Sequence, residues 1–380
     1  MTCLKLKKPY PFIYPFVFFL IFACAPMETQ VYESPVYEAL GGQPEVKVAI
    51  VKGEKKVVLS GSTISYKAGG RKGTLRKGRL VVEATGKGLR LNGKGYYSSS
   101  IQIDGLDIKV EGRPYRGALR LIIEDGAVTV VNRIGLEEYL MGIINHEISS
   151  AWSIEAVKAQ AVAARTYAYD KLKSRSTQAY HLQATVMDQV YGGSGTEDSR
   201  AIGAVNDTKG EVLFYGNKVA QALFHSSCGG HTEAAEMVWG GDYPYLRGVE
   251  DPYCTEAPNY FWIYQASFDS IAGLFSRAGY PSSRDFSISG RTDSGRAKSV
   301  YYGKTEVSGN ELRKILGYSK LKSALFDVRT EDDGLVFSGS GSGHGVGLCQ
   351  WGAKGMAEEG FHYNEILDFY YRGTELKKVY

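Results

Sequence analysis

Apolar side chains recur at helical spacing along residues 136–148. The positions that share one face of this predicted helix are Leu136, Leu140, Ile143 and Ile144. At about 100° per residue, Glu147 falls near the middle of the same face, whereas Glu137 and Glu138 point elsewhere. A carboxylate on an apolar face is energetically costly unless it is paired, protonated or functional. The pattern therefore singles out Glu147.

A second helix is predicted from Ser153, a favourable N-terminal capping residue, to about Leu172. Small side chains form a narrow stripe along it, which lets another element approach closely. Arg165 borders this stripe and could reach a carboxylate. Two interpretations of Glu147 therefore stay open, a buried ion pair with Arg165 and a functional acid.

Residues 45–130 alternate apolar and polar side chains in short runs separated by glycine-containing turns, as is typical of β-hairpins. The predicted strands cover residues 46–51, 56–59, 80–83, 101–108, 119–124 and 127–131. The segment 71–79 is basic. We interpret this segment as the solvated loop of a hairpin; the alternative is contact with an anionic wall polymer or phospholipid.

Strand-like runs return in the second half of the chain, at residues 186–193, 211–215 and 219–225. The loop from Ser226 to Tyr260 is long and lacks periodicity, which is typical of functional loops. The remaining predicted elements are an α/β portion at 270–338, a helix that ends near Glu359 and a last helix at 364–371. We expect an α+β fold, with a β-rich N-terminal region at 45–115 and a larger domain at 116–375 that contains the helical pair at about 136–172.

The N-terminus has the pattern of a targeting segment. Three lysines precede an apolar run that is too short to span a membrane, so residues 1–23 are predicted to be a signal peptide. The run ends at Cys24 in a sequence similar to the bacterial lipobox. We therefore expect Cys24 to be lipidated, residues 24–44 to be a linker, and the protein to be a membrane-anchored lipoprotein of the periplasm or cell envelope. The alternative is an ordinary secretory signal that is cut near Ala23 or Ala25.

The charge of the chain argues against a nucleic-acid partner. Three of the 45 Lys and Arg residues lie in the targeting segment and none of the 41 Asp and Glu residues does, so the remainder is nearly neutral. The chain has 380 residues, 43% of them hydrophobic, which is enough for two domains with cores. Its 27 tyrosines suit either strand packing or stacking on sugar rings.

Three cysteines remain once Cys3 is removed and Cys24 is lipidated, namely Cys228, Cys254 and Cys349. In an oxidising compartment two of them could pair, and Cys228 with Cys254 is the candidate disulfide. The alternatives are no bond at all and a zinc site. Its candidate ligands are His225, Cys228 and His231 with Cys254 or Cys349. Because this spacing is not a standard zinc-ligand pair, we assign no metal and no cofactor.

The glycine run at 339–347 lacks the Gly-Lys-Ser/Thr ending of a phosphate-binding loop. Its notable residue is His344, and Gln350 follows six residues later. A serine nucleophile, Ser226 or Ser227 with His225 or His344, is disfavoured because the strand–turn–helix context of a nucleophile elbow is absent.

Four sequence blocks, in order, resemble one family. They are Leu136 to Ala168, Asp188-Gln-Val-Tyr-Gly-Gly193, Phe224-His-Ser-Ser-Cys-Gly-Gly-His-Thr-Glu233 and His344-Gly-Val-Gly-Leu-Cys-Gln-Trp-Gly-Ala353. Together they resemble the SpoIID/LytB domain family, which includes stage II sporulation protein D and the amidase enhancer, over about residues 100–375. Two departures are Ser149, where the family usually has proline, and Met187 and Asp188, where some relatives have zinc ligands; of that site only His181 remains here.

The resemblance implies a lytic transglycosylase that cleaves peptidoglycan glycan strands, preferably strands stripped of stem peptides, and it aligns the catalytic glutamate with Glu147. We expect His225, Ser226, His344 and Gln350 to line the glycan groove, and Tyr191 and Trp239 to stack on sugars. The expected partners are glycan strands, a cell-wall amidase, and the membrane through the N-terminal lipid. The alternative is a lipoprotein that binds glycan without cleaving it and recruits or activates an amidase.

Overall fold

The computed structural model describes residues 42–96, 98–186 and 188–380. The predicted signal peptide, Cys24 and most of the expected linker lie outside the described residues. Within the described part of the chain, no helix is long and apolar enough to cross a membrane. The fold is α+β, as predicted.

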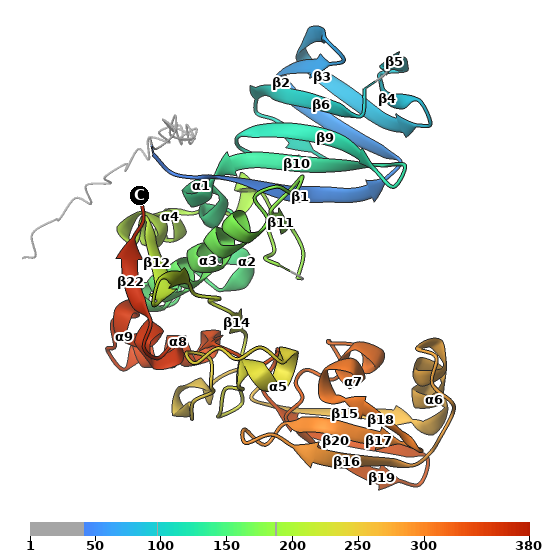
Figure 1. The fold of residues 1–380 in the computed structure, drawn as a ribbon, viewed down its shortest axis with the longest axis vertical. Helices are drawn as coiled ribbons and strands as arrows, with labels where there is room; N and C mark the ends of the chain where they lie inside the picture. Colours follow the sequence, from blue (N-terminus) through green and yellow to red (C-terminus); the bar gives the residue numbers. More distant parts are fainter. Residues whose placement is uncertain (1–41, 97, 187) are drawn as a thin grey trace, which may run out of the picture. The chain divides into compact units, whose positions relative to one another are not determined.

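The first half of the chain forms an 11-stranded sheet, with the strands side by side in Figure 1. Its strands are β1 (Glu45–Glu54), β2 (Lys56–Ala68), β3 (Arg71–Thr85), β4 (Gly88–Leu91), β5 (Lys94–Tyr96), β6 (Ser100–Leu106), β7 (Lys109–Val110), β8 (Arg113–Pro114), β9 (Ala118–Glu124), β10 (Ala127–Gly135) and β11 (Leu182–Gln183). The strand order is β11-β1-β10-β9-β6-β2-β3-β4-β5, and β7 pairs with β2 and β8. Neighbours are antiparallel except β1 and β11.

The alternation of apolar and polar residues produces this sheet, because successive side chains of a strand point to opposite faces. Val57 and Leu59 of β2 are fully buried, whereas Val58 between them is only partly buried. The basic segment 71–79, however, is not a hairpin loop. It is the first part of β3 and pairs with β2 from Arg71 to Arg79. The sheet also continues across residues 115 and 116, so the expected domain boundary there stays a prediction.

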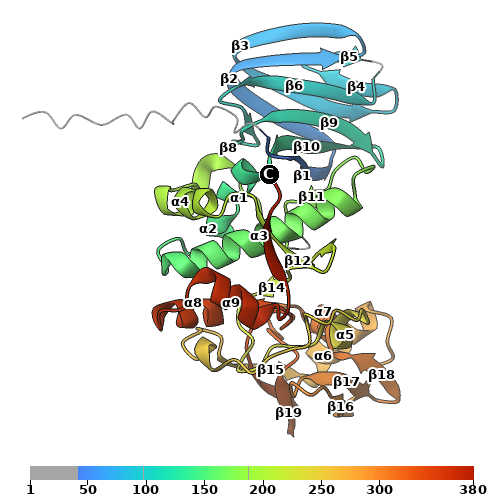
Figure 2. The same ribbon diagram turned by 60° about the vertical axis from the view of Figure 1, so that its left-hand side comes forward.

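Four helices lie between residues 136 and 207. They are α1 (Leu136–Met141), α2 (Ile144–Glu147), α3 (Ile154–Ser174) and α4 (Ser199–Asp207). The prediction of a single helix at 136–148 is therefore wrong, because α1 ends at Met141 and α2 begins at Ile144. The second predicted helix is confirmed, and it begins directly after Ser153, although the Ser153 side chain makes no capping hydrogen bond. The predicted stripe of small residues, Val157, Ala161, Ala164 and Ala168, is fully buried. A different set of α3 residues, Ala156, Ala159, Val162 and Ala163, packs in one core with α8 and α9, which lie next to α3 in Figure 2.

The rest of the chain adds small sheets and short helices. The strands are β12 (Glu211–Tyr215), β13 (Lys218–Val219), β14 (Phe224–His225), β15 (Phe261–Ser267), β16 (Phe286–Arg291), β17 (Ala297–Tyr302), β18 (Thr305–Ser308), β19 (Phe326–Glu331), β20 (Gly334–Ser340), β21 (Leu348–Cys349) and β22 (Glu375–Lys378). The helices are α5 (Ala235–Trp239), α6 (Phe268–Arg277), α7 (Gly309–Leu316), α8 (Gln350–Glu358) and α9 (Tyr363–Tyr370), with 3-10 turns η1 (Ser194–Thr196) and η2 (Pro252–Cys254).

Two features of this half position the site. Strand β14 runs parallel to β21, so that His225 lies opposite Cys349. Residues 188–193, expected to be a strand, instead form an extended loop without strand pairing, and Val186 before them is 85% exposed. The run expected at 219–225 is likewise two short strands, β13 and β14, with irregular chain between them.

Candidate functional site

Glu147 lines a pocket of about 390 Å³. The pocket is formed by three segments that are distant in sequence, and its lining residues are Asn145, His146, Glu147, Ile148, Ser149, Trp152, Ser226, Gln350 and Trp351. The Glu147 side chain is partly buried and partly open to this pocket. The acid that the hydrophobic pattern singled out is thus accessible from outside the protein.

Gly142 directly follows α1, at the break between α1 and α2. A β-carbon at this position would lie 2.6 Å from a ring carbon of Tyr191, so only glycine fits beneath that ring. The helix then restarts for one turn, and Ile148 ends it in an extended conformation. Glu147 consequently occupies the last position of α2, at the edge of the chain reversal rather than in the middle of a continuous helix.

A polar network fixes the turn after Glu147. The side chains of Asn145 and Ser150 both donate hydrogen bonds of 2.6 Å to Oδ2 of Asp198. The backbone N–H of Ser150 donates to Oδ1 of Asn145 at 3.1 Å. Asp198 also caps α4, where its side chain accepts from the N–H groups of Arg200 and Ala201. These bonds hold residues 145–150 in one conformation around the acid.

The surroundings of Glu147 favour its protonated form near neutral pH. Burial raises the pKa of its carboxyl from the ordinary 4.5 to about 7. Two hydrogen bonds oppose this shift, one from the backbone N–H of Val190 to Oε1 at 3.2 Å and one from the Gln350 side chain. The carboxyl can therefore give up a proton and, once ionised, is held by two donors.

The block at 188–193 positions the Val190 donor. The carboxylate of Asp188 accepts hydrogen bonds from the Tyr167 hydroxyl at 2.8 Å and the Gln183 N–H at 2.9 Å, and it pairs with Arg175 at 3.1 Å. The neighbouring Gln189, 1% exposed, accepts from the Tyr139 hydroxyl at 3.0 Å. The loop is irregular but anchored directly before the N–H that contacts Glu147.

The ion-pair interpretation of Glu147 is wrong, because Arg165 pairs with another acid. Nη2 of Arg165 lies 2.7 Å from Oε2 of Glu137, and both side chains are fully buried. Oε1 of Glu137 further accepts from the Gly210 N–H at 3.1 Å and the Tyr380 hydroxyl at 2.6 Å. Glu137, which was expected to point away from the apolar face, is therefore the acid of the buried ion pair.

Two of the residues predicted to bind substrate, Ser226 and Gln350, line the pocket with Glu147. Nε2 of Gln350 donates a hydrogen bond of 3.4 Å to Oε1 of Gln160 in α3. The Ser226 carbonyl accepts from the Trp351 N–H at 3.1 Å. The loop after β14 and the start of α8 therefore place Ser226 and Gln350 in the same pocket.

The other predicted binding residues do not line this pocket. His225, His344 and Trp239 form a separate aromatic cluster, with ring centroids 5.5 Å apart for the two histidines and 5.1 Å for His344 and Trp239. Burial lowers the pKa of His344 to about 4 and holds that of His225 well below its usual value. Tyr191 is 3% exposed and donates to Oδ1 of Asn132, so its ring has no open face for a sugar.

Sequence reasoning missed an aromatic pair in the pocket. The rings of Trp152 and Trp351 meet edge to face, with centroids 5.0 Å apart, and both side chains are partly exposed. Asn145 and His146 were missed as well. A signal existed for both tryptophans, since Trp152 lies within the first family-like block and Trp351 directly follows Gln350.

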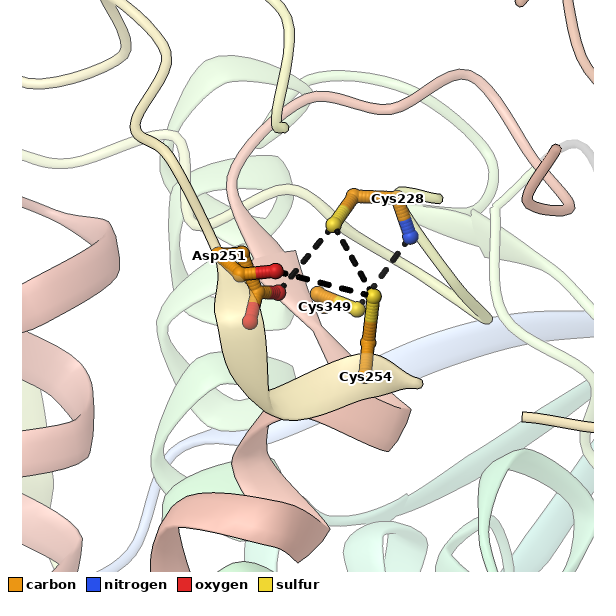
Figure 3. Close-up of side chains that lie close together, drawn as sticks. All are labelled: Cys228, Asp251, Cys254 and Cys349. Carbon is orange, nitrogen blue, oxygen red and sulfur yellow. Dashed lines mark hydrogen bonds between the residues drawn. The ribbon is translucent and has the colours of Figure 1, made fainter. Parts of the chain in front are cut away.

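The three cysteines and Asp251 converge close to the pocket (Figure 3). The sulfurs of Cys228 and Cys254 are 3.4 Å apart, longer than the about 2.05 Å of a disulfide, so this bond is not formed in the structure. The two histidines of the considered zinc set are turned to the backbone, His225 to the Val346 carbonyl and His231 to that of Thr232. His181 accepts from the Lys47 N–H, and no candidate metal cluster among the described residues includes it.

Comparison with known proteins gives a consistent result. Residues 124–215 match the family model described as SpoIID, stage II sporulation protein. The chain is 37% identical to an uncharacterised protein of Brachyspira hyodysenteriae, over 78% of this chain and 81% of that protein. It is 33% identical to stage II sporulation protein D of Bacillus subtilis, over 66% of this chain and 76% of the relative. It is also 30% identical to the amidase enhancer of Bacillus subtilis, over 80% of this chain but only 49% of that longer protein. The chain therefore belongs to the SpoIID/LytB family.

Proposed function

We propose that the protein is a peptidoglycan lytic transglycosylase with Glu147 as its general acid and base. The observation that carries this proposal is a carboxyl group with a pKa raised to about 7 in an open pocket. Among the described residues, Glu147 is the single carboxylate that lines the pocket. Ordinary glycoside hydrolysis uses two carboxylates that flank the bond, whereas a transglycosylase that makes an intramolecular product needs one.

In the proposed reaction the Glu147 carboxyl donates its proton to the oxygen between N-acetylmuramic acid and N-acetylglucosamine. The bond from this oxygen to C1 of the muramyl residue breaks, and the glucosamine strand leaves with the proton. The carboxylate of Glu147 then takes the proton of the muramyl C6 hydroxyl, whose oxygen bonds to C1. The product is a 1,6-anhydro end, and no water is consumed.

The chain's own groups support both halves of this cycle. Desolvation keeps Glu147 protonated before the first step, and the Val190 N–H and the Gln350 side chain stabilise the carboxylate after it. The tryptophans Trp152 and Trp351 offer apolar surface to sugar rings. The amides of Asn145 and Gln350 and the hydroxyl of Ser226 are suited to bind sugar hydroxyls or acetamide groups.

Membership of the family supports a role at the cell wall, outside the cytoplasm. In keeping with this location, we propose that residues 1–23 are a signal peptide and that Cys24 carries a lipid anchor. The substrate preference for glycan stripped of stem peptides is likewise part of the proposal.

The chemistry is tested by digesting intact and amidase-stripped sacculi in water enriched in the heavy oxygen isotope. We expect the wild-type protein to release muramyl ends that are one water lighter than reducing ends and that carry no heavy oxygen, with more product from stripped sacculi. Glu147→Gln is expected to release these ends about 10²- to 10⁴-fold more slowly. Heavy oxygen in the new ends would indicate hydrolysis and would overturn the transglycosylase assignment, as would undiminished product from the variant.

A second candidate function is a non-catalytic partner that binds glycan and activates a cell-wall amidase. It is favoured by the relative named amidase enhancer. An amidase assay with added protein distinguishes the two. A purely activating protein would stimulate the amidase equally well as wild type and as Glu147→Gln, and it would leave no anhydro ends.

A further inference from the structure

Four potential metal ligands meet beside the pocket, and all four residues are fully buried. Sγ of Cys228, Cys254 and Cys349 and a carboxylate oxygen of Asp251 all lie within 4.8 Å of one another (Figure 3). They come from three separate segments, namely the loop after β14, the 3-10 turn η2 with the residue before it, and the junction of β21 with α8.

The separations agree with one tetrahedral metal ion. A zinc–sulfur distance of about 2.3 Å places two sulfurs of a tetrahedron about 3.8 Å apart, and a sulfur and a carboxylate oxygen about 3.5 Å apart. The structure has 3.4 Å between the sulfurs of Cys228 and Cys254 and 3.1 Å between Sγ of Cys228 and Oδ2 of Asp251. Both separations are about 0.4 Å shorter than these values, so a small outward adjustment of the side chains is enough to seat the ion.

We propose that Cys228, Asp251, Cys254 and Cys349 bind one structural Zn²⁺ ion. Three thiolates and one carboxylate form a closed four-ligand set that suits this soft, tetrahedral ion. The simpler alternative is a single disulfide. It would use only two of the three sulfurs and would leave one free thiol and a carboxylate buried next to each other. An iron–sulfur cluster would need more room between the cysteines than these distances allow.

Hydrogen bonds from neighbouring groups orient two of the four ligands, Cys349 and Asp251. Sγ of Cys349 accepts from two backbone N–H groups, those of Cys228 at 3.2 Å and Gly352 at 3.3 Å. The Asp251 carboxylate accepts from the Tyr370 hydroxyl at 2.9 Å and the Tyr253 N–H at 3.0 Å. Such second contacts fix ligand geometry and favour the ionised thiolate and carboxylate.

Charge and packing fit the same assignment. A divalent cation offsets half of the four negative charges of the ligands, and the buried Arg296, which donates to the Cys228 carbonyl at 2.7 Å, adds a positive charge nearby. At Gly352 a β-carbon would lie 2.0 Å from the Tyr370 hydroxyl and 2.4 Å from the Asp251 carboxylate. Glycine is therefore needed for α8 to approach these groups.

The ion would tie together the segments that form one wall of the Glu147 pocket. Ser226 lies two residues before Cys228, and Gln350 and Trp351 directly follow Cys349. This inference goes beyond the proposed glycan cleavage and does not depend on it, since the metal has no part in the chemistry. It also differs from the sequence analysis, which assigned no metal and considered histidine ligands that the structure turns away.

The test is the metal content of the full chain, purified without chelator and with any affinity tag removed. Wild-type protein is expected to retain about one zinc per chain by elemental mass spectrometry. Asp251→Asn and Cys349→Ser are expected to lower the zinc content at least about tenfold. Matched controls are His231→Ala, from the rejected ligand set, and Asp242→Asn, an exposed acid in the same long loop. Both are expected to keep their zinc.

A measurement on wild-type protein guards against variants that fail to fold. Alkylation followed by peptide mass spectrometry should show Cys228, Cys254 and Cys349 protected in the native protein and all three labelled after a chelator and denaturant are added. Exchange with Co²⁺ should give thiolate-to-cobalt charge-transfer absorption. A Cys228–Cys254 disulfide-linked peptide, or a reduced protein that binds neither zinc nor cobalt, would overturn the proposal. Neither result depends on whether the protein cleaves glycan.

Discussion

Glu137 on α1 and Glu147 on α2 are only ten residues apart, yet the protein uses them in opposite ways. Glu137 is fully buried, and its carboxylate contacts Arg165, the Gly210 N–H and the Tyr380 hydroxyl. Glu147 instead faces a pocket, where it accepts from one backbone N–H and the Gln350 side chain, both uncharged donors. Burial raises its pKa to about 7. Both carboxyl groups are shielded from water. Their hydrogen-bond and ion-pair partners make Glu137 a structural ion and leave Glu147 able to transfer a proton.

The first test of this difference removes the group that is proposed to transfer the proton. Glu147→Gln keeps the shape and the hydrogen-bonding capacity of the side chain but cannot donate a proton as an acid. We expect the rate of glycan cleavage to fall by about 10²- to 10⁴-fold, the contribution of a positioned acid or base. The measurement is the initial rate of anhydro-product release, with the thermal midpoint as a folding control. A rate within a factor of a few of wild type would contradict the assignment of Glu147.

The second way is to strip Glu137 of its cation. Arg165→Met leaves a buried carboxylate without its counter-ion, which typically destabilises by about 3–5 kcal/mol. The free energy of unfolding from urea titration measures this loss. The double variant Glu137→Leu with Arg165→Met is expected to recover part of it, because no uncompensated charge remains. A single variant as stable as wild type would show that the ion pair does not hold α1 against α3.

The third test uses pH to separate the two acids. Since the pKa of Glu147 is raised in the folded protein from 4.5 to about 7, the folded state holds this proton more tightly than the unfolded chain. Its contribution to stability is therefore fully present below about pH 4.5 and is lost as the pH rises through about 7. Between these limits we expect wild type to lose on the order of 2–3 kcal/mol relative to Glu147→Gln.

Urea titrations of wild type and Glu147→Gln across this pH range give the difference directly, because all other titrating groups cancel. Cleavage should also decline above about pH 7, as the acid loses its proton. A stability difference that is independent of pH, or one that grows in favour of wild type as the pH rises, would show that Glu147 does not hold a proton near neutrality.

The smallest expected effect distinguishes the pocket from the aromatic cluster beside it. Trp152→Ala or Trp351→Ala removes about 0.5–1.5 kcal/mol of aromatic contact and is expected to raise KM about two- to tenfold. Trp239→Ala is the matched control, since Trp239 is exposed but lies against His344, outside the pocket lining. A larger KM change for Trp239 than for the other two would shift the glycan path toward the histidine cluster.

Local pattern determined much of the fold. The alternation in residues 45–130 predicts the sheet, and the helix predicted after Ser153 is found at Ile154–Ser174. Periodicity also drew attention to Glu147 as an acid in a costly position. It failed at Gly142, where α1 ends and the ring of Tyr191, far away along the chain, packs so closely that only glycine fits. It failed again at 71–79, where pairing with β2 overrides the basic, loop-like composition.

What the sequence by itself determined is therefore the set of chemical groups: an acid on an apolar face, three cysteines beyond Cys24, and the blocks around Ser226 and Gln350. Only the tertiary structure decided their partners. Arg165 pairs with Glu137, and Gln350 and the Val190 N–H contact Glu147. Trp152 packs against Trp351, and the three cysteines lie close to Asp251. Each of these contacts joins different segments, and no spacing rule within one helix or strand specifies which distant segment packs against it.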